Sequence, residues 1–355
     1  MVCIRHRWLV ASLALGALAV GAGACKKDEK KADQAAAGGP AGDNAAGGVT
    51  AEKPATGSSA AAGDAISMLP KSSEIVIGLN IGQVAQSPLF KKFIEPQLAT
   101  KRAEISQKIG DFKAKCGFDP VEAVLGGTVV MGVSGVDENN AEAIIVVTGA
   151  PDKAKVMDCI GKVKDEAAKN GSEVTIDGDF VMVKNKDENQ GMVATYANPS
   201  TMVIATSKNP TKEALQAAIA GTNSLKSSDA FMQYYGKLNT KHTMWMVVNG
   251  KGKMFDQVAA MGGKPQFLYG SINVTDGIAM DFRMRFQTAD VATQVAKAVD
   301  GQVNMVRGMA GGNIKELKVT SEGDEVKTTV LLTAQNIEAL AKQFGGMLGA
   351  HGGGM

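Results

Sequence analysis

The chain has 355 residues, of which 45% are apolar, with 38 lysines and arginines against 36 aspartates and glutamates. Residues 1–24 contain two arginines and no acidic residue, so the remainder has equal numbers of basic and acidic residues and a formal charge of zero. A protein that binds nucleic acid normally shows a basic excess or a basic cluster. The composition therefore indicates that nucleic acid is not a partner.

The first 24 residues have the pattern of a secretory signal. Arg5 and Arg7 precede Trp8–Val20, a run without any charged residue. This run is too short for a membrane-spanning helix, which needs about 20 apolar residues. Small residues follow it, ending with Ala22-Gly23-Ala24 directly before Cys25. We expect residues 1–24 to be removed as a signal peptide.

The small residues before Cys25 resemble the signal of bacterial lipoproteins, in which the cysteine becomes the first residue of the mature chain. The resemblance implies a lipid on Cys25 and attachment to a membrane of the cell envelope. Lys26 stands where an Asp in that family commonly retains the protein in the inner membrane, which favours the outer membrane. Ala22 departs from the usual Leu, and Ala22-Gly23-Ala24 also fits an ordinary cleavage site, which leaves an unlipidated form open.

The segment 25–64 is rich in Ala, Gly, Ser and charged residues and has no aromatic residue. Such a composition cannot bury enough apolar surface to offset the entropy of ordering. We expect a disordered tether with a root-mean-square span of roughly 35 Å. A folded body should follow at 65–345, as one large domain or two similar subdomains, and 346–355 should be a flexible tail.

Strand pairs joined by turns dominate the expected body. Asp177-Gly178 and Asp276-Gly277 each separate two short apolar runs, as in β-hairpins. In the run 278–286, apolar residues alternate with Ala279, Asp281, Arg283 and Arg285. This alternation predicts a strand of an antiparallel sheet with one apolar and one solvated face.

Helical segments follow the strand pairs, opening near Pro151, Pro210, Asp290 and Asn336. Proline and short polar residues suit the first positions of a helix. We therefore predict an α+β fold, in which recurring strand–strand–helix units form a mostly antiparallel sheet with the helices on one face.

The start of the body carries a second resemblance. The stretch 69–80 reads LPKSSEIVIGLN, is followed by SPLF at 87–90, and a further phrase, CGFDP, occupies 116–120. These phrases are similar to those of uncharacterised myxobacterial-type lipoproteins. The resemblance covers about the first third of the body and implies no activity.

Catalytic patterns are scarce in this sequence. His242 is the only histidine between the signal and the tail, and the glycine-rich and histidine-rich motifs of serine hydrolases, P-loop proteins and zinc proteases are missing. We expect no enzymatic activity and no cofactor. An enzyme with a carboxylate-based site stays open, because carboxylates are brought together only in space.

His242, Met244 and Met246 are alternate residues and would share one face of a strand, with Trp245 on the other. An imidazole and two thioethers are ligands that suit Cu(I). The alternative is that these methionines fill the core, since the chain has 18 of them. We expect the core interpretation, and therefore no metal site.

Two cysteines continue the apolar stripes of two predicted helices, so both should point inward. In an oxidising compartment this arrangement favours a disulfide between Cys116 and Cys159. Two unpaired buried cysteines are the alternative. The stripes consist of Ile105, Ile109, Phe112 and Cys116 in the first helix and of Val156, Cys159, Ile160, Val163 and Ala167 in the second.

The leading hypothesis from the sequence is a non-catalytic lipoprotein of the cell envelope whose body acts as a binding or structural module. Its partners would be the membrane, through the lipid, and an envelope protein or ligand that the sequence does not identify. A periplasmic copper-handling protein and a carboxylate enzyme are the alternatives.

Overall fold

The computed structural model describes residues 64–96, 102–120, 123, 126–136, 141–169, 171–185, 190–309, 314–340 and 342. Residues 1–24, Cys25, nearly all of the expected tether and the 346–355 tail lie outside the described residues.

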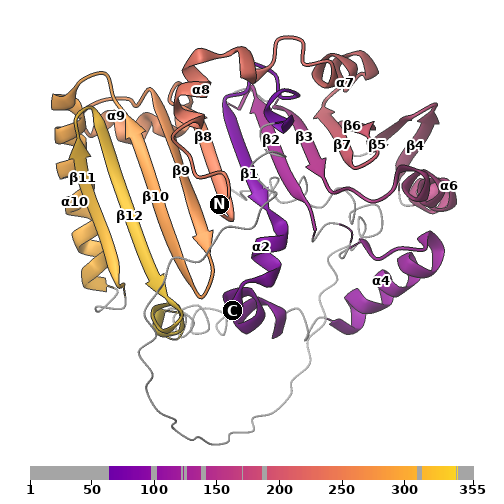
Figure 1. Ribbon diagram of the computed structural model, residues 1–355, viewed down its shortest axis with the longest axis horizontal. Coiled ribbons are helices and arrows are strands. Elements are labelled where there is room, and N and C mark those ends of the chain that lie inside the picture. Colours follow the sequence, from indigo (N-terminus) through magenta and orange to yellow (C-terminus); the bar gives the residue numbers. More distant parts are fainter. Residues whose placement is uncertain are drawn as a thin grey trace, which may run out of the picture.

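Within the described ranges, twelve strands form one antiparallel sheet, which confirms the prediction of a mostly antiparallel mixed fold (Figure 1). Their order across the sheet is β11-β12-β10-β9-β8-β1-β2-β3-β7-β6-β5-β4. The strands are β1 (Ile75–Asn80), β2 (Thr128–Ser134), β3 (Glu142–Thr148), β4 (Ser172–Asp177), β5 (Phe180–Asn185), β6 (Gly191–Asn198), β7 (Thr201–Ser207), β8 (Met244–Asn249), β9 (Phe267–Val274), β10 (Gly277–Arg285), β11 (Glu316–Glu322) and β12 (Glu325–Thr333).

The helices connect and flank these strands. A helical turn also occupies 334–340, directly after β12. The named helical elements are α2 (Ile81–Gln86), η3 (Phe90–Ile94), α4 (Arg102–Cys116), α6 (Lys153–Lys169), α7 (Lys212–Ile219), η4 (Leu225–Ser227), α8 (Asp229–Tyr235), η5 (Lys253–Phe255), α9 (Asp256–Ala260) and α10 (Ala289–Met309).

The chain repeats one connection pattern in its two halves. In the first half, β1, β2 and β3 run outward from the centre of the sheet, α6 follows, and the later strands return so that β7 pairs with β3. In the second half, β8, β9 and β10 run outward, α10 follows, and β12 pairs with β10. The first half differs by its additional hairpin, β4–β5. Both halves share one sheet.

Strands β1 and β8 join the halves about a local two-fold axis. Ile77 pairs with Met246 at the middle of the two strands. The backbone N–H of Asn249 donates to Glu74 at 2.7 Å, and the N–H of Asn80 donates to Thr243 at 2.8 Å. Asn80 corresponds to Asn249 and Glu74 to Thr243, because both pairs are 169 positions apart and make the same bond.

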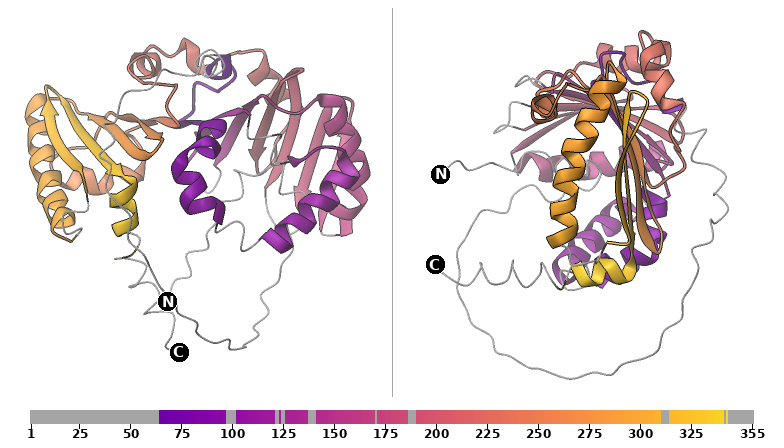
Figure 2. Two further views of the ribbon diagram at one scale, coloured as in Figure 1. Left: turned by 60° about the horizontal axis from the view of Figure 1, so that its bottom comes forward. Right: turned by 90° about the vertical axis from the view of Figure 1, so that its left-hand side faces the viewer.

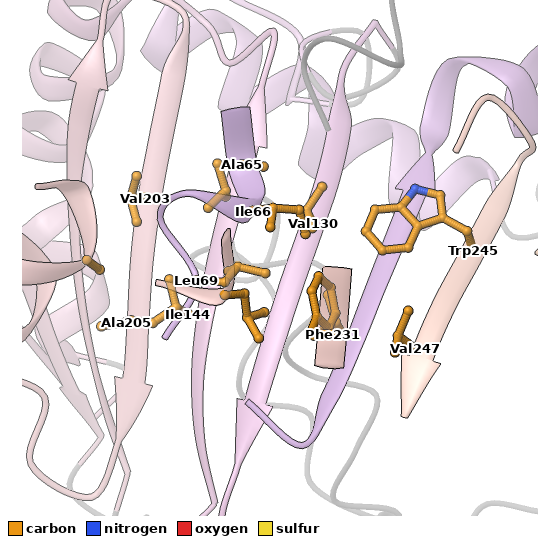
Figure 3. Packing of buried hydrophobic residues seen from close by; sticks show 14 of the residues in the cluster. Ala65, Ile66, Leu69, Val130, Ile144, Val203, Ala205, Phe231, Trp245 and Val247 are labelled. Atoms are coloured by element: carbon orange, nitrogen blue, oxygen red, sulfur yellow. The ribbon is translucent and has the colours of Figure 1, made fainter. Parts of the chain in front are cut away.

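The side of the sheet that carries Trp245 is named here the tryptophan face. Leu215 of α7, Phe231 and Tyr234 of α8 and the N-terminal turn at Ile66 pack on it against the sheet (Figure 3). The sheet side chains in this core are fully buried, with exposed fractions of 0–2% for Val76, Val130, Val203, Trp245, Val247 and Tyr269.

The opposite side, which carries Met246, is named the methionine face. Val156 and Ile160 of α6 pack there against Val181 of β5, and Val295 of α10 packs near Val326 of β12. Helices therefore cover both faces of the sheet, and the expectation of helices on one face is wrong. The side chains of strands such as β7 are buried on both sides of the sheet. Such strands need a covering element on each side.

Helices α6 and α10 lie near opposite ends of the sheet. Helix α6 contacts the edge strand β4, and α10 contacts β11 and β12 at the other edge (Figure 2). The central strands β9, β8, β1 and β2 lie between these two ends.

The structure places a disulfide between Cys116 and Cys159, the pair that the sequence predicted, with their Cα atoms 4.5 Å apart. It joins the end of α4 to the middle of α6. Lys115 and Glu166 form an ion pair beside it at 2.6 Å, and the rings of Phe112 and Phe118 meet edge to face. These contacts fix α4 to the helix that covers the β4 end.

We predict that Gly78→Ala destabilises the fold, because an added Cβ at Gly78 would lie 2.0 Å from Cε2 of the buried Trp245 ring. Overpacking of this kind costs about 1–3 kcal/mol or more. The matched control is Gly161→Ala in α6, where an added Cβ meets no atom within 4 Å. It should stabilise by about 0.5–1 kcal/mol. Urea unfolding measures both, and equal midpoints for the two variants would contradict the packing described.

Candidate functional site

The central strands present an apolar surface on the methionine face. On β1, β8, β9 and β10 the side chains that point to this face are all apolar, because the charged residues of β10 lie on the tryptophan face. Twelve of these side chains are only half-buried. Met284 packs against the cluster beneath α10 and Val274 ends β9, which leaves ten in the middle of the four strands. They form what we name the central apolar face: Ile75, Ile77, Leu79, Met244, Met246, Leu268, Ile272, Ile278, Met280 and Phe282.

The two faces of the same strands differ sharply in burial. Trp245 and Val247 on β8 are exposed by 0% and 2%, while Met244 and Met246 on the other face are half-buried and only Val248, near the end of the strand, is buried there. A soluble protein rarely leaves a contiguous apolar surface accessible unless that surface binds something. The central apolar face is therefore the principal candidate site.

Methionine is concentrated on this side of the sheet. Of the eight methionines in the described strands, Met182 points to the tryptophan face. The other seven point to the methionine face: Met131, Met192, Met202, Met244, Met246, Met280 and Met284. Methionine is unbranched and polarizable, and it is common on surfaces that adapt to varied apolar ligands. The methionine side chains of the site can therefore adapt to ligands of different shape.

In the first half of the chain, α6 covers the outer strands of the methionine face, while Val129 and Met131 of β2 stay half-buried. Beneath α6, a cavity of about 40 Å³ is lined by residues that include Met157, Ile160, Met192 and Met202. A cavity needs at least about 10–15 Å³ to hold one water, so this one has room for only a few water-sized groups. Tyr196 borders it and donates a hydrogen bond to the carbonyl of Pro151 at 2.7 Å, and burial raises its pKa to about 12.

A network of charges lies on the tryptophan face of the second half. The carboxylate of Glu325, 7% exposed, accepts hydrogen bonds from Lys237 at 2.8 Å and Tyr269 at 2.7 Å. Arg283 donates to its other oxygen at 3.3 Å, and Arg285 is 4.0 Å away. The network therefore connects Lys237, two residues after the end of α8, to strands β9, β10 and β12.

The pKa of Glu325 follows from these partners. Burial alone would raise it, but hydrogen bonds from Lys237 and Tyr269 and the charge of Lys237 hold the pKa below its ordinary value. The pKa of Tyr269 is raised by burial and by its hydrogen bond to Glu325. The carboxylate is therefore ionised at neutral pH and paired with cations, which gives it a structural role in joining α8 to the sheet.

His242 lies beside Ser271, and its nitrogens are both hydrogen-bonded. The backbone N–H of Lys241 donates to Oδ1 of Asn239 at 3.2 Å, so the amide nitrogen of Asn239 is the atom that donates to Nε2 of His242 at 2.8 Å. The imidazole proton is then on Nδ1, 2.8 Å from the hydroxyl of Ser271. In this tautomer His242 cannot take a proton from Ser271, as a catalytic base would.

The shared face of His242, Met244 and Met246, on which the copper alternative depends, does not form, and the two methionines are half-buried and not enclosed in the core as expected. The strand begins only at Met244, and the imidazole turns to Ser271, which pairs with Trp245 on the tryptophan face. Burial lowers the pKa of His242, partly opposed by the charge of Asp281. Across the described ranges, no three His, Cys, Asp or Glu side chains are grouped so as to hold a metal ion.

The sequence analysis missed the central apolar face. It treated the apolar side of 278–286 as core, since alternation shows which residues share a face but not whether a helix covers it. Cys25, the expected lipid site, lies outside the described residues.

No helix in the described part of the chain has both the length and the apolar character needed to cross a membrane. Comparison of the chain with protein-family models, curated proteins and solved structures found no match.

We predict that Glu325→Gln destabilises the protein at pH 7 by about 1–3 kcal/mol, because it removes the charge that three cations face. The folded pKa of Glu325 is lowered, so its stabilisation is complete above the unfolded pKa of about 4.3 and is lost as the pH falls through the folded value. Unfolding by urea between pH 3 and 7 should therefore show the variant and the wild type converging at low pH.

The control for this series is Glu322→Gln, which removes a carboxylate that also pairs with Arg283 but is 48% exposed. We expect a change of less than about 0.5 kcal/mol. A pH-independent difference between Glu325→Gln and the wild type would contradict the role assigned to the ionised carboxylate.

Proposed function

We propose that this chain is a lipid-anchored protein of the outer membrane of the cell envelope, whose body binds an apolar ligand on the central apolar face. The observation that carries the binding function is the contrast between the two sides of β8, with Trp245 fully buried and Met246 accessible. The secretory pattern of 1–24 and the small residues before Cys25 support the location.

The distribution of helices supports a binding role for the body. Helices α6 and α10 cover the outer strands of the methionine face and leave accessible apolar side chains on the strands between them. The tryptophan face of these central strands is packed with side chains from α7, α8 and the N-terminal turn. A sheet packed on one side of β1 and β8, with accessible apolar side chains on the other, suits ligand binding.

The alternatives from the sequence receive less support from the geometry. A copper site would need His242 beside Met244 and Met246, and the imidazole instead bonds Ser271 and Asn239. A carboxylate site would need an accessible acid, and Glu325, the most enclosed carboxylate of the charge network, is bound by Lys237, Tyr269 and Arg283. We therefore favour binding over metal handling or catalysis.

We predict that the mature chain binds the apolar fluorescent probe ANS and that Met246→Glu or Met280→Glu lowers its bound emission at least several-fold, because a charge on the face opposes apolar binding. The matched controls, Met254→Glu and Met305→Glu, alter methionines that are 57% and 66% exposed elsewhere. These should bind the probe as the wild type does. Equal binding by all four variants, with native circular dichroism, would exclude the face as the site.

The anchoring is tested separately. We predict that Cys25→Ser moves the mature protein from the detergent phase to the aqueous phase in a phase-separation assay, because two or more acyl chains give stable membrane attachment. Mass spectrometry of the N-terminal peptide provides the second measurement. A wild-type chain that partitions into water and begins at an unmodified Cys25 would contradict the lipid anchor.

A further inference from the structure

We infer that the ligand of the central apolar face is the acyl chain of a membrane phospholipid. This inference rests on the proposed binding function and specifies its ligand class. It depends on the chemistry of the face, its dimensions and its distance from the membrane.

The chemistry of the face favours a pure hydrocarbon. Each of β1, β8, β9 and β10 is paired on both edges, so backbone N–H and C=O groups in these ladders are already used. Side chains on this side of the four strands carry no charge. An extended peptide would bury its own polar backbone against this surface without partners, at a substantial cost. A hydrocarbon chain has no such groups.

The dimensions of the face match a lipid chain. The strands from β1 through β8 and β9 to β10 are neighbours, at a spacing of about 4.8 Å, so the surface is roughly 15–20 Å wide. Strand β1 has six residues and is therefore about 20 Å long. An acyl chain spans about half of the 30 Å hydrocarbon core of a bilayer, or about 15 Å. The face accommodates one chain at full length, or two side by side.

The local two-fold repeat does not reproduce the site in the first half of the chain. In the first half, β3 corresponds to β10, and Ile145 and Val147 of β3, which point to the methionine face, are both buried. In the second half, Ile278, Met280 and Phe282 on β10 stay half-buried. The site therefore extends from the axis at Ile77 and Met246 toward β10.

The proposed lipid on Cys25 would keep the body near a membrane. Asp64 is the first described residue, and 38 residues separate it from Cys25. A flexible segment of that length spans roughly 35 Å. With Cys25 fixed in a bilayer by its lipid, the body stays within reach of the membrane surface, where phospholipid acyl chains are the most abundant apolar groups.

Direct binding tests the inference. The mature chain is titrated with cis-parinaric acid, a fluorescent polyene fatty acid, and the bound probe is then displaced with short-chain phosphatidylglycerol. We expect saturable binding and displacement, with at least a tenfold weaker affinity for Met280→Glu and a change of less than twofold for Met254→Glu. Ile272→Asp provides a second substitution on the face if Met280→Glu fails to fold.

A second experiment tests whether the bound acyl chain comes from a phospholipid. The protein is purified from its native envelope in wild-type and Cys25→Ser form, and co-purified lipid is identified by mass spectrometry. Phospholipid on both forms supports the inference. Displacement of the probe by the synthetic peptide 343–355 but not by phospholipid, or by self-association of the chain, would overturn it. ANS binding that depends on Met246 without any acyl-chain binding would also overturn it, while leaving the proposed binding function intact.

Discussion

The pairing of β1 with β8 is the interaction on which the rest of the structure depends. It joins two halves that would otherwise each end in an open sheet edge, and it places Ile77 opposite Met246 at the centre of a twelve-stranded sheet. Gly78 makes this contact possible, because the Trp245 ring occupies the space where a side chain at that position would lie. The tight contact on one side of the sheet fixes the register, and a slip of one residue would exchange the two faces.

This register separates the molecule into a packed side and an accessible side. The tryptophan face receives α7, α8 and the N-terminal turn, and its central side chains are excluded from solvent. The methionine face receives α6 and α10 toward the ends of the sheet, where they follow the third strand of each half. Because both helices follow the outward-running strands, the two-fold repeat itself keeps them away from the centre.

The charge network around Glu325 has a structural role, unlike the central apolar face. Glu325 is nearly enclosed and is surrounded by Lys237, Tyr269 and Arg283, so its polar atoms are satisfied within the protein. It holds the end of α8 against the second half of the sheet, on the side opposite the proposed site.

Much of the architecture could be read from the sequence. Turns at Asp177-Gly178 and Asp276-Gly277 and the alternation in 278–286 predicted antiparallel strands, and the two inward cysteines predicted the bridge between α4 and α6. These features are local, since turn residues and side-chain periodicity act over a few positions. The neutral charge of the chain after residue 24 and the pattern before Cys25 were also set by sequence alone.

Tertiary structure decided which faces are covered. Alternation assigns Met280 and Phe282 to one side of a strand, but whether a helix lies over them depends on where α10 packs, which is over the neighbouring strands β12 and β11. The place of His242 was likewise fixed by Ser271 and Asn239 and not by its spacing from Met244. The sequence by itself determined the strands, their apolar sides and the cysteine pair. The pairing of β1 with β8 decided that one of those sides stays accessible, because whether a helix covers a strand depends on packing between residues far apart in the sequence.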